Sequence, residues 1–332
     1  MRWLYLVLGI GILAIVVIDI LWTTLWVDGG SGPLSGRLTT GVWRILRAVG
    51  RRGSRTLGIA GPLILTLTLA MWIALLWLGW TVLFASSQGA LVGTHTGEPA
   101  DWVGRLYYVA YTMFTNGNGD YTPTSSAWEI ASSLTTATGM AFVTLGISYV
   151  LTVLGAVSEK RSFASDVTGL GTNSEAFVRS GWDGQSFEGI ERPLESMATQ
   201  LSHLAEQHEA YPILHYYHSE QADRASAMAV PVLDEALTLY LHGVSDHERP
   251  DPTHLLLARS SADSYLETLE SAFIEPADEA PPPPNLEALR DAGIDTVSDD
   301  AFEDALEEHA DRRRRLLGVV RADAWHWPPR ER

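Results

Sequence analysis

Three long apolar runs in the first half of the sequence most constrain what this chain can fold into. They cover residues 3–27, 56–86 and 129–158. Each run can cross a hydrocarbon layer about 30 Å thick, because an α-helix rises about 1.5 Å per residue. Most charges of this half lie between the runs rather than inside them. We therefore predict an all-α membrane protein with three transmembrane helices.

The second half of the chain has a different character. Residues 159–332 carry a net charge of −19, whereas residues 1–158 carry +2. This split predicts a membrane domain followed by an acidic, water-facing domain, and the surplus acid disfavours a nucleic-acid partner. The absence of cysteine excludes disulfides, thiolate metal sites and a cysteine nucleophile. The preference for arginine over lysine fits a salt-adapted surface or a GC-rich genome equally well.

Basic residues between the first two runs set the predicted topology. The segment 29–55 contains Arg37, Arg44, Arg47, Arg51, Arg52 and Arg55. Positive charge favours the cytoplasmic side, so we expect the N-terminus outside and the C-terminal domain in the cytoplasm, with the protein in the plasma membrane. Arginines recur at helical spacing beside apolar residues over residues 38–50. This pattern predicts a basic amphipathic helix along the inner membrane surface.

One carboxylate, Asp19, lies inside the first apolar run. A carboxylate within a membrane span is costly and usually faces protein or water. We interpret Asp19 as a partner in helix packing rather than as an ion-binding residue.

The segment 102–123 is too apolar for a loop, yet too short and too rich in glycine for a span. Asp101 can start a short helix over residues 102–114, and Gly117 and Gly119 follow it with a permissive backbone. Irregular backbone at membrane depth survives only where it is buried in protein or lines a water-filled path. We therefore predict a re-entrant hairpin between the second and third spans.

Residues 115–123 read T-N-G-N-G-D-Y-T-P and resemble the signature of tetrameric potassium-channel pores, T-V-G-Y-G-D-x-x-P. An apolar span precedes the hairpin and another follows it, as in that family. The resemblance covers about residues 56–161 and implies a two-helix pore-loop domain. Its parts would be an outer helix at 56–86, a pore helix at 102–114, a filter at 115–120 and an inner helix at 129–158.

The resemblance also implies roles for individual residues. The filter, whose carbonyl oxygens replace the hydration shell of K⁺, would be Thr115, Asn116, Gly117, Asn118, Gly119 and Asp120. The pore-helix residues that could brace it are Tyr107, Tyr108, Tyr111 and Thr112. The candidates for a gating hinge in the inner helix are Gly139 and Gly146. One pore loop per chain implies a homotetramer in the lipid bilayer, conducting K⁺ or other monovalent cations.

Two residues depart from the family pattern. Asn116 stands where the family has an apolar residue, and Asn118 stands where it has an aromatic one. If these amides hydrogen-bond to the pore helix, the filter stays narrow and selects potassium. If they do not, the filter widens and discriminates poorly between potassium and sodium. A weakly selective cation channel is therefore the alternative to a potassium channel.

The C-terminal half shows apolar residues at helical spacing and no catalytic motif. It lacks a dinucleotide-binding glycine fingerprint, a P-loop and a nucleophile elbow, so we expect neither an enzyme nor a cofactor. The histidines His203, His208, His215 and His218 could hold a transition metal or sense protons, but polar helix surface is the commoner explanation, and we assign no metal. A non-conducting sensor or scaffold remains the alternative from another class of protein.

These observations divide the chain into six segments. They are an N-terminal transmembrane helix at 1–28, the basic amphipathic segment at 29–55, the pore domain at 56–160, an acidic helical domain at 161–275, a stiff Pro-rich linker at 276–285 and a helical tail at 286–332.

Overall fold

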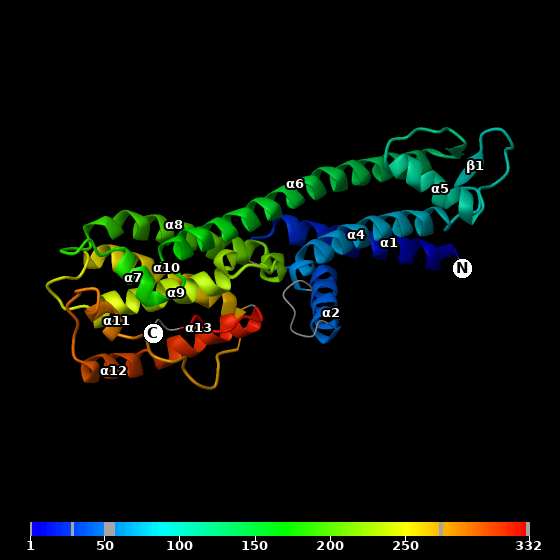
Figure 1. The fold of residues 1–332 in the computed structure, drawn as a ribbon. Helices are drawn as coiled ribbons and strands as arrows, with labels where there is room; N and C mark the ends of the chain where they lie inside the picture. The colour runs from blue at the N-terminus through cyan, green and yellow to red at the C-terminus, as the bar shows by residue number, and fades with distance from the viewer. Residues whose placement is uncertain (1, 28–29, 50–56, 272–274, 330–332) are drawn as a thin grey trace. The chain divides into compact units, whose positions relative to one another are not determined.

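The structure, a computed structural model, describes residues 2–27, 30–49, 57–271 and 275–329 (Figure 1). Arg51, Arg52, Arg55 and Thr56 of the predicted segments lie outside the described residues. The chain forms two compact units, one of residues 1–42 and 62–153 and the other of residues 43–61 and 154–332.

The first unit contains the helices that can cross a membrane. Its elements are α1 (Arg2–Leu25), the start of α2 (Pro33–Val49), α4 (Ala60–Phe84), β1 (Leu91–Gly93), α5 (Trp102–Met113), β2 (Tyr121–Pro123) and the first part of α6 (Ser126–Leu170). By length and composition, α1, α4 and α6 are each able to span a bilayer. The predicted all-α membrane fold is confirmed.

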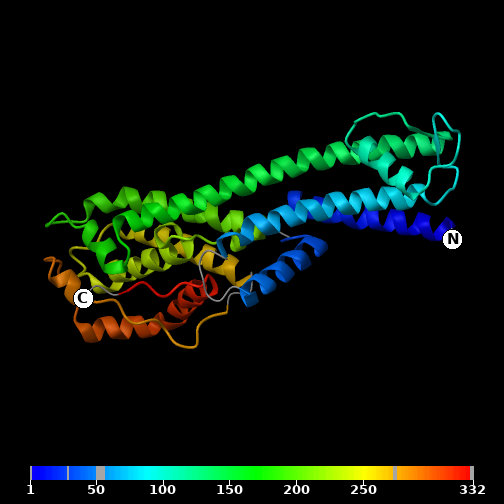
Figure 2. The same ribbon diagram turned by 45° about the vertical axis from the view of Figure 1, so that its right-hand side comes forward.

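Helices α1 and α4 lie side by side and antiparallel (Figures 1 and 2). The backbone of Leu83 passes so close to Gly9 that a Cβ atom there would meet it at 2.7 Å. About one turn further along the pair, a Cβ atom on Gly79 would meet the Leu13 side chain at 2.9 Å. Small residues let the two backbones approach closely, which is how helices associate in lipid without a hydrophobic driving force.

Asp19 is fully buried at the centre of a polar network that joins three helices. Its Oδ1 accepts hydrogen bonds from the backbone N–H groups of Leu34, at 2.7 Å, and Ser35, at 3.2 Å. Its Oδ2 accepts from the Ser35 hydroxyl, at 2.6 Å, and from Trp72 Nε1, at 2.7 Å. The carboxylate thus caps the first turn of α2 and ties α1 to α4, which agrees with a role in helix packing.

The second unit is a helical bundle with one continuous core. Its elements are the rest of α2 and α6, α7 (Ser174–Ser180), η1 (Glu188–Ile190), α8 (Glu191–Ala210), η2 (Pro212–Tyr216), η3 (Ala222–Arg224), α9 (Ser226–Thr238), η4 (Leu239–Gly243), α10 (Pro252–Ser271), α11 (Glu287–Arg290), α12 (Asp299–Glu308) and α13 (Ala310–Ala322).

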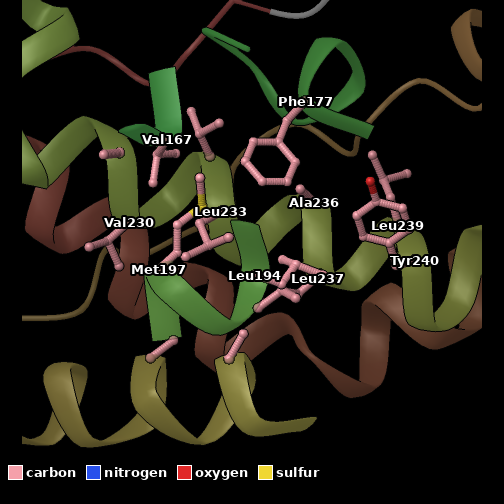
Figure 3. Packing of buried hydrophobic residues seen from close by; sticks show 14 of the residues in the cluster. Val167, Phe177, Leu194, Met197, Val230, Leu233, Ala236, Leu237, Leu239 and Tyr240 are labelled. Atoms are coloured by element: carbon pink, nitrogen blue, oxygen red, sulfur yellow. The ribbon is translucent and has the colours of Figure 1, made fainter. Parts of the chain in front are cut away.

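Helix α9 forms the centre of this core, and all of its residues except Met228 are buried. Figure 3 shows Val230, Leu233 and Leu237 among side chains from neighbouring helices. Helix α8 contributes apolar residues at helical spacing, including Leu194 and Met197. A helix that is apolar on nearly every side, as α9 is apart from its few buried polar residues, lies inside a bundle, whereas an amphipathic helix covers it.

The largest differences from the predicted segment boundaries concern the inner helix and the C-terminal tail. The predicted inner helix ends at residue 158, but α6 continues to Leu170 and places Val167 in the core of the second unit. The predicted tail, 286–332, was separated from the helical domain by a linker, yet its Phe302 and Leu316 belong to that same core. Apolar residues on one face of α12 and α13 can only be buried against another helix, and α9 supplies that surface together with its neighbours.

Candidate functional site: the pore segment

The predicted filter residues form one stretch of irregular backbone between α5 and β2. Asp101 starts α5 by accepting a hydrogen bond from the Gly104 N–H at 2.7 Å, as expected of an N-cap residue. Beyond the helix, φ is +60° at Thr115, +63° at Gly117 and +75° at Gly119. Every second residue is therefore left-handed, which glycine adopts readily and threonine does not.

This alternation has a chemical consequence. In a chain whose residues alternate in hand, successive carbonyl groups can point to the same side instead of to opposite sides as in a β-strand. Thr115 lies in a conformation that costs a non-glycine residue energy, and such strained residues cluster at functional sites. The backbone of this stretch can therefore present a row of oxygen atoms to a cation.

Tyr107 connects the pore helix to the filter. Its hydroxyl accepts a hydrogen bond from Asn118 Nδ2 at 2.6 Å and donates one to Asp120 Oδ2 at 2.9 Å. The amide that replaces the family's aromatic residue is therefore bonded to α5 in this structure. These contacts hold two filter residues at a fixed distance from the helix.

Tyr111 and Tyr108 connect α5 to β2, α6 and α4. The Tyr111 hydroxyl donates to the Tyr121 carbonyl at 3.1 Å and accepts from the Tyr121 N–H at 3.3 Å. The Tyr108 hydroxyl bonds to the Ser132 hydroxyl on α6, and its ring packs edge-on against Phe84 of α4. Both tyrosines therefore connect α5 to its surroundings rather than to the side chains of Asn116 or Asn118.

Asn116 is held through its backbone only. Its N–H donates to the Tyr111 carbonyl at 2.7 Å, while its exposed side chain has no hydrogen-bond partner among the described residues. Thr112 contributes its carbonyl, which accepts from the Thr115 N–H at 3.1 Å and from the Thr136 hydroxyl at 3.2 Å. Of the two asparagine side chains, only that of Asn118 therefore hydrogen-bonds to the pore helix.

Thr94 holds the predicted filter stretch through contacts that sequence reasoning missed. It follows β1, which pairs with β2 in antiparallel register, Leu91 facing Pro123. The Thr94 hydroxyl donates to the Gly119 carbonyl at 2.6 Å, and its N–H donates to the Asp120 carbonyl at 2.9 Å. No sequence motif marks this residue, because the contact forms only when β1 and β2, each three residues long, pair with each other.

The two candidate hinge glycines differ in their surroundings. A Cβ atom on Gly139 would collide with the carbonyl oxygen of Met113 at the end of α5. A Cβ atom on Gly146 would meet only Leu69 Cδ2 at 3.6 Å, an ordinary van der Waals distance. The close approach of α5 and α6 thus requires a glycine at position 139, and a hinge at either position stays a prediction.

The four singled-out histidines do not form one cluster. His203 is exposed on α8, whereas His208 is buried with Nδ1 at 2.8 Å from the Leu204 carbonyl. His215 and His208 line a cavity of about 20 Å³, the volume of about one water molecule, together with Lys160, Ser226, Tyr265 and Asp323.

Lys160 and His218 secure the segment around η2. The Lys160 ammonium donates to the carbonyls of Leu214, at 3.1 Å, and Tyr217, at 3.3 Å. His218 Nδ1 lies 2.9 Å from Asp323 Oδ1 of the chain beyond α13. These contacts fix a stretch of backbone that has little regular hydrogen bonding of its own.

The neutral histidines of this cavity predict a pH dependence of stability. Burial, and then the Lys160 charge, lower the pKa of His215 to about 4. The same two causes lower the pKa of His208 well below its ordinary value. Because the unfolded chain binds these protons more readily, stability is lost as pH falls from 6.5 toward 4. For His215 we expect a loss of about 2 kcal/mol by about pH 5.

Thermal melting of the full chain, followed by circular dichroism, measures this loss. The substitution His215→Gln should flatten the dependence of the melting temperature on pH, and His203→Gln at the exposed position should leave it unchanged. An equally steep dependence in His215→Gln would show that other groups titrate. The groups facing this histidine are Lys160, Asp323 and His208.

A buried ion-pair network joins α13 to α9, and the sequence analysis did not predict it. Asp234 pairs with Arg259, at 2.9 Å, and with Arg312. The adjacent Glu235 pairs with Arg313 at 2.7 Å. Both carboxylates are buried, so their arginines are needed to compensate for the lost hydration. The sequence feature that could have indicated this network is the pair of adjacent acids in an otherwise apolar helix.

One group of side chains in the described part of the chain has the ligand types for a metal ion. His247, Glu248 and Asp295 place one ligand atom each within 4.8 Å of one another. The imidazole and the Asp295 carboxylate are exposed. They lie outside the pore segment and were not singled out from the sequence.

The pore segment, its flanking membrane helices and the comparisons with known proteins define the class. Residues 67–156 match the family model described as "Ion channel". This range contains most of α4, all of α5, the filter stretch and α6 up to Ala156. The chain is a membrane protein with a pore-loop ion-channel domain.

The similarity to one known membrane protein extends over nearly the whole chain. It is 40% identical over 327 residues to "Uncharacterized membrane protein YdjJ" of Bacillus subtilis (strain 168), covering 98% of this chain and 96% of that protein. The chain belongs to the family of this membrane protein. No solved structure matches it significantly.

Proposed function

We propose that this ion channel conducts potassium through a filter formed by residues 115–120. The observation that carries the proposal is the left-handed conformation of Thr115, Gly117 and Gly119 in a stretch tied to the pore helix. Such a backbone can offer rings of carbonyl oxygens that replace the hydration shell of a cation. Asp120, beside the last filter glycine, supplies negative charge that attracts cations to the mouth of the pore.

The proposed channel is a homotetramer. Each chain has one pore segment, so a closed ring of oxygen atoms needs several copies, and cyclic symmetry arranges identical chains around one axis. Four copies correspond to the family whose filter signature this chain resembles. No enzyme activity or cofactor is part of the proposal.

We further propose that the protein lies in the plasma membrane with its acidic domain in the cytoplasm. Six arginines between the first two spans support this orientation, because positive loops stay on the cytoplasmic side. The acidic domain would then concentrate cations at the inner mouth of the pore.

Selectivity depends on the two asparagines, whose side chains make different contacts in the structure. Asn118 is bonded to Tyr107, which supports a narrow, potassium-selective filter. The Asn116 side chain is exposed and has no hydrogen-bond partner among the described residues, which favours the second candidate, a weakly selective cation channel. A carbonyl filter that can relax outward loses its preference for the larger ion.

Ion flux from liposomes tests the proposed function. Purified full-length protein is reconstituted, and efflux is compared in potassium and sodium gradients, with protein-free liposomes as the control. We expect cation flux that is faster with potassium. Equal rates would support the weakly selective channel, and no flux from folded tetramers under any applied voltage or pH would contradict the proposal.

Loss of the Tyr107 hydroxyl should weaken selectivity. In Tyr107→Phe, both Asn118 and Asp120 lose a hydrogen bond, each contributing about 1 kcal/mol. The two bonds together correspond to about 2 kcal/mol, so we expect the ratio of potassium to sodium permeability to fall by a factor of up to about 30, measured in the same liposomes. Tyr5→Phe on α1 removes the same atom away from the filter and should leave the ratio unchanged. An unaltered ratio in Tyr107→Phe would show that this hydroxyl does not brace the filter.

A further inference from the structure

Helix α2 carries positive charge that the described chain does not neutralise. Arg37 and Arg44 are exposed, and neither has a carboxylate or hydrogen-bond partner among the described residues. The sequence has no Asp or Glu between residues 29 and 97. By contrast, Arg312 and Arg313 are fully paired with buried acids in a domain that has acid in excess.

The side chains of α2 form three strips along its axis. Residues spaced seven apart share a face of a helix, so Arg37 and Arg44 lie in one exposed strip. Ser35 and Thr39 are buried on the opposite side, toward the protein. The apolar residues between the two sides are Leu34, Leu38 and Ile45, and the last of these is 65% exposed.

The start of α2 is fixed against the last turns of a membrane span, because Asp19 lies six residues before Leu25, the last residue of α1. Asp19 of α1 bonds to the backbone N–H groups of Leu34 and Ser35, and α1 is long and apolar enough to cross the bilayer. From this point α2 turns away from the axis of α1 (Figure 1). A helix that leaves a span in this way runs through the headgroup region, where lipid phosphates lie.

We propose that the arginine strip of α2 binds the headgroups of anionic lipids. The guanidinium groups of Arg37 and Arg44 donate paired hydrogen bonds to lipid phosphate, a geometry that arginine matches better than lysine. Ile45, beside Arg44, inserts among the acyl chains. The bound partner is a lipid surface rather than the acidic domain of a second copy, because the strip begins beside the last turns of a membrane span. The inference depends on the membrane span and not on ion conduction.

Lipid retention by the purified protein tests this site. The full-length protein in detergent is titrated with phosphatidylglycerol or with phosphatidylcholine of the same acyl chains, and bound lipid is counted by native mass spectrometry. We expect tighter binding of phosphatidylglycerol, weakened by salt. In the double variant Arg37→Gln, Arg44→Gln the affinity should fall about 30-fold, since each arginine near an anionic surface contributes a factor of about five.

Two further variants serve as controls. Arg192→Gln removes an exposed arginine from α8 and should leave the affinity unchanged. Arg37→Lys with Arg44→Lys keeps the charge and should retain most of the affinity, which separates loss of charge from misfolding. Equal affinity in the glutamine variant, or equal binding of both lipids by the wild-type protein, would overturn the proposal. Dissociation of the oligomer by the glutamine variant in every lipid would instead assign the strip to a neighbouring chain.

Discussion

The substitution Gly117→Ala is expected to abolish cation flux while leaving the protein folded. Gly117 has φ of +63°, and a Cβ atom there would meet nothing within 4 Å in the same chain. The substitution therefore acts through the backbone, because an L-residue in the left-handed region costs about 1–2 kcal/mol. The strained residue should relax toward negative φ and turn its carbonyl away. In the proposed tetramer four copies multiply the cost, so we expect flux to fall to the level of protein-free liposomes.

Gly97→Ala is the matched control for this experiment. Gly97 also has positive φ, at +67°, and also faces open space, but it lies in the loop between β1 and α5. Equal backbone strain outside the filter should leave flux near the wild-type rate. If Gly117→Ala conducts as well as Gly97→Ala, the alternating backbone is not the conduction path.

The substitution Asp19→Ala is expected to destabilise the membrane unit by about 3–5 kcal/mol, which is typical of breaking a buried charge network. It leaves the Leu34 and Ser35 N–H groups and the Trp72 indole without their acceptor in a buried site. Each unsatisfied buried donor costs about 1–3 kcal/mol. Thermal unfolding of the detergent-solubilised protein measures the effect, and we expect a markedly lower melting temperature.

Two variants separate the contributions to this network. Trp72→Phe removes one donor and leaves the carboxylate with three hydrogen bonds, so it should cost about 1–2 kcal/mol. Asp19→Asn keeps the shape and one acceptor oxygen and should lie between the two. A melting temperature for Asp19→Ala that equals the wild-type value would show that solvent replaces the lost contacts.

The membrane fold was predictable because its signals are local. An uncharged run of the right length specifies a spanning helix almost irrespective of the rest of the chain. The pore helix 102–114 differs from α5 by one residue, since Asp101 fixes its start and the glycines follow its end. The sequence predicts too early an end for the inner helix, because the continuation of α6 past residue 158 is polar enough to resemble a domain boundary.

The packing of the C-terminal unit was not predictable in the same way. Residues 286–322 follow a Pro-rich stretch that was interpreted as a linker, and only their burial with α9 shows that they complete its core. Helical periodicity identifies an apolar face but does not name the surface that covers it. The two adjacent acids of α9 indicate buried ion pairs, but the identity of their partners, such as Arg312 for Asp234, depends on that same docking.

Within the pore segment, sequence reasoning predicted the filter positions but not all of the contacts that hold this stretch of backbone. The six filter positions follow from a motif whose spacing reflects backbone conformation. The bond from Asn118 to Tyr107 was one of two conditional outcomes, because amide geometry depends on the turn of the preceding helix. Thr94 lies just after β1 and 25 residues before Gly119 in the sequence, and a contact between residues so far apart has no local sequence signature.

The network around Asp19 also bears on how the protein enters its membrane. During synthesis α2 supplies three of the four donors to the carboxylate soon after α1, and the indole of Trp72 completes the network only once α4 is made. A helix released into lipid with an incompletely partnered charge is unfavourable. Helices α1 and α4 are therefore expected to remain with the insertion machinery until both are complete and to pass into the bilayer as a hairpin. The chemistry of one side chain thus couples the order of synthesis to the assembly of the membrane unit.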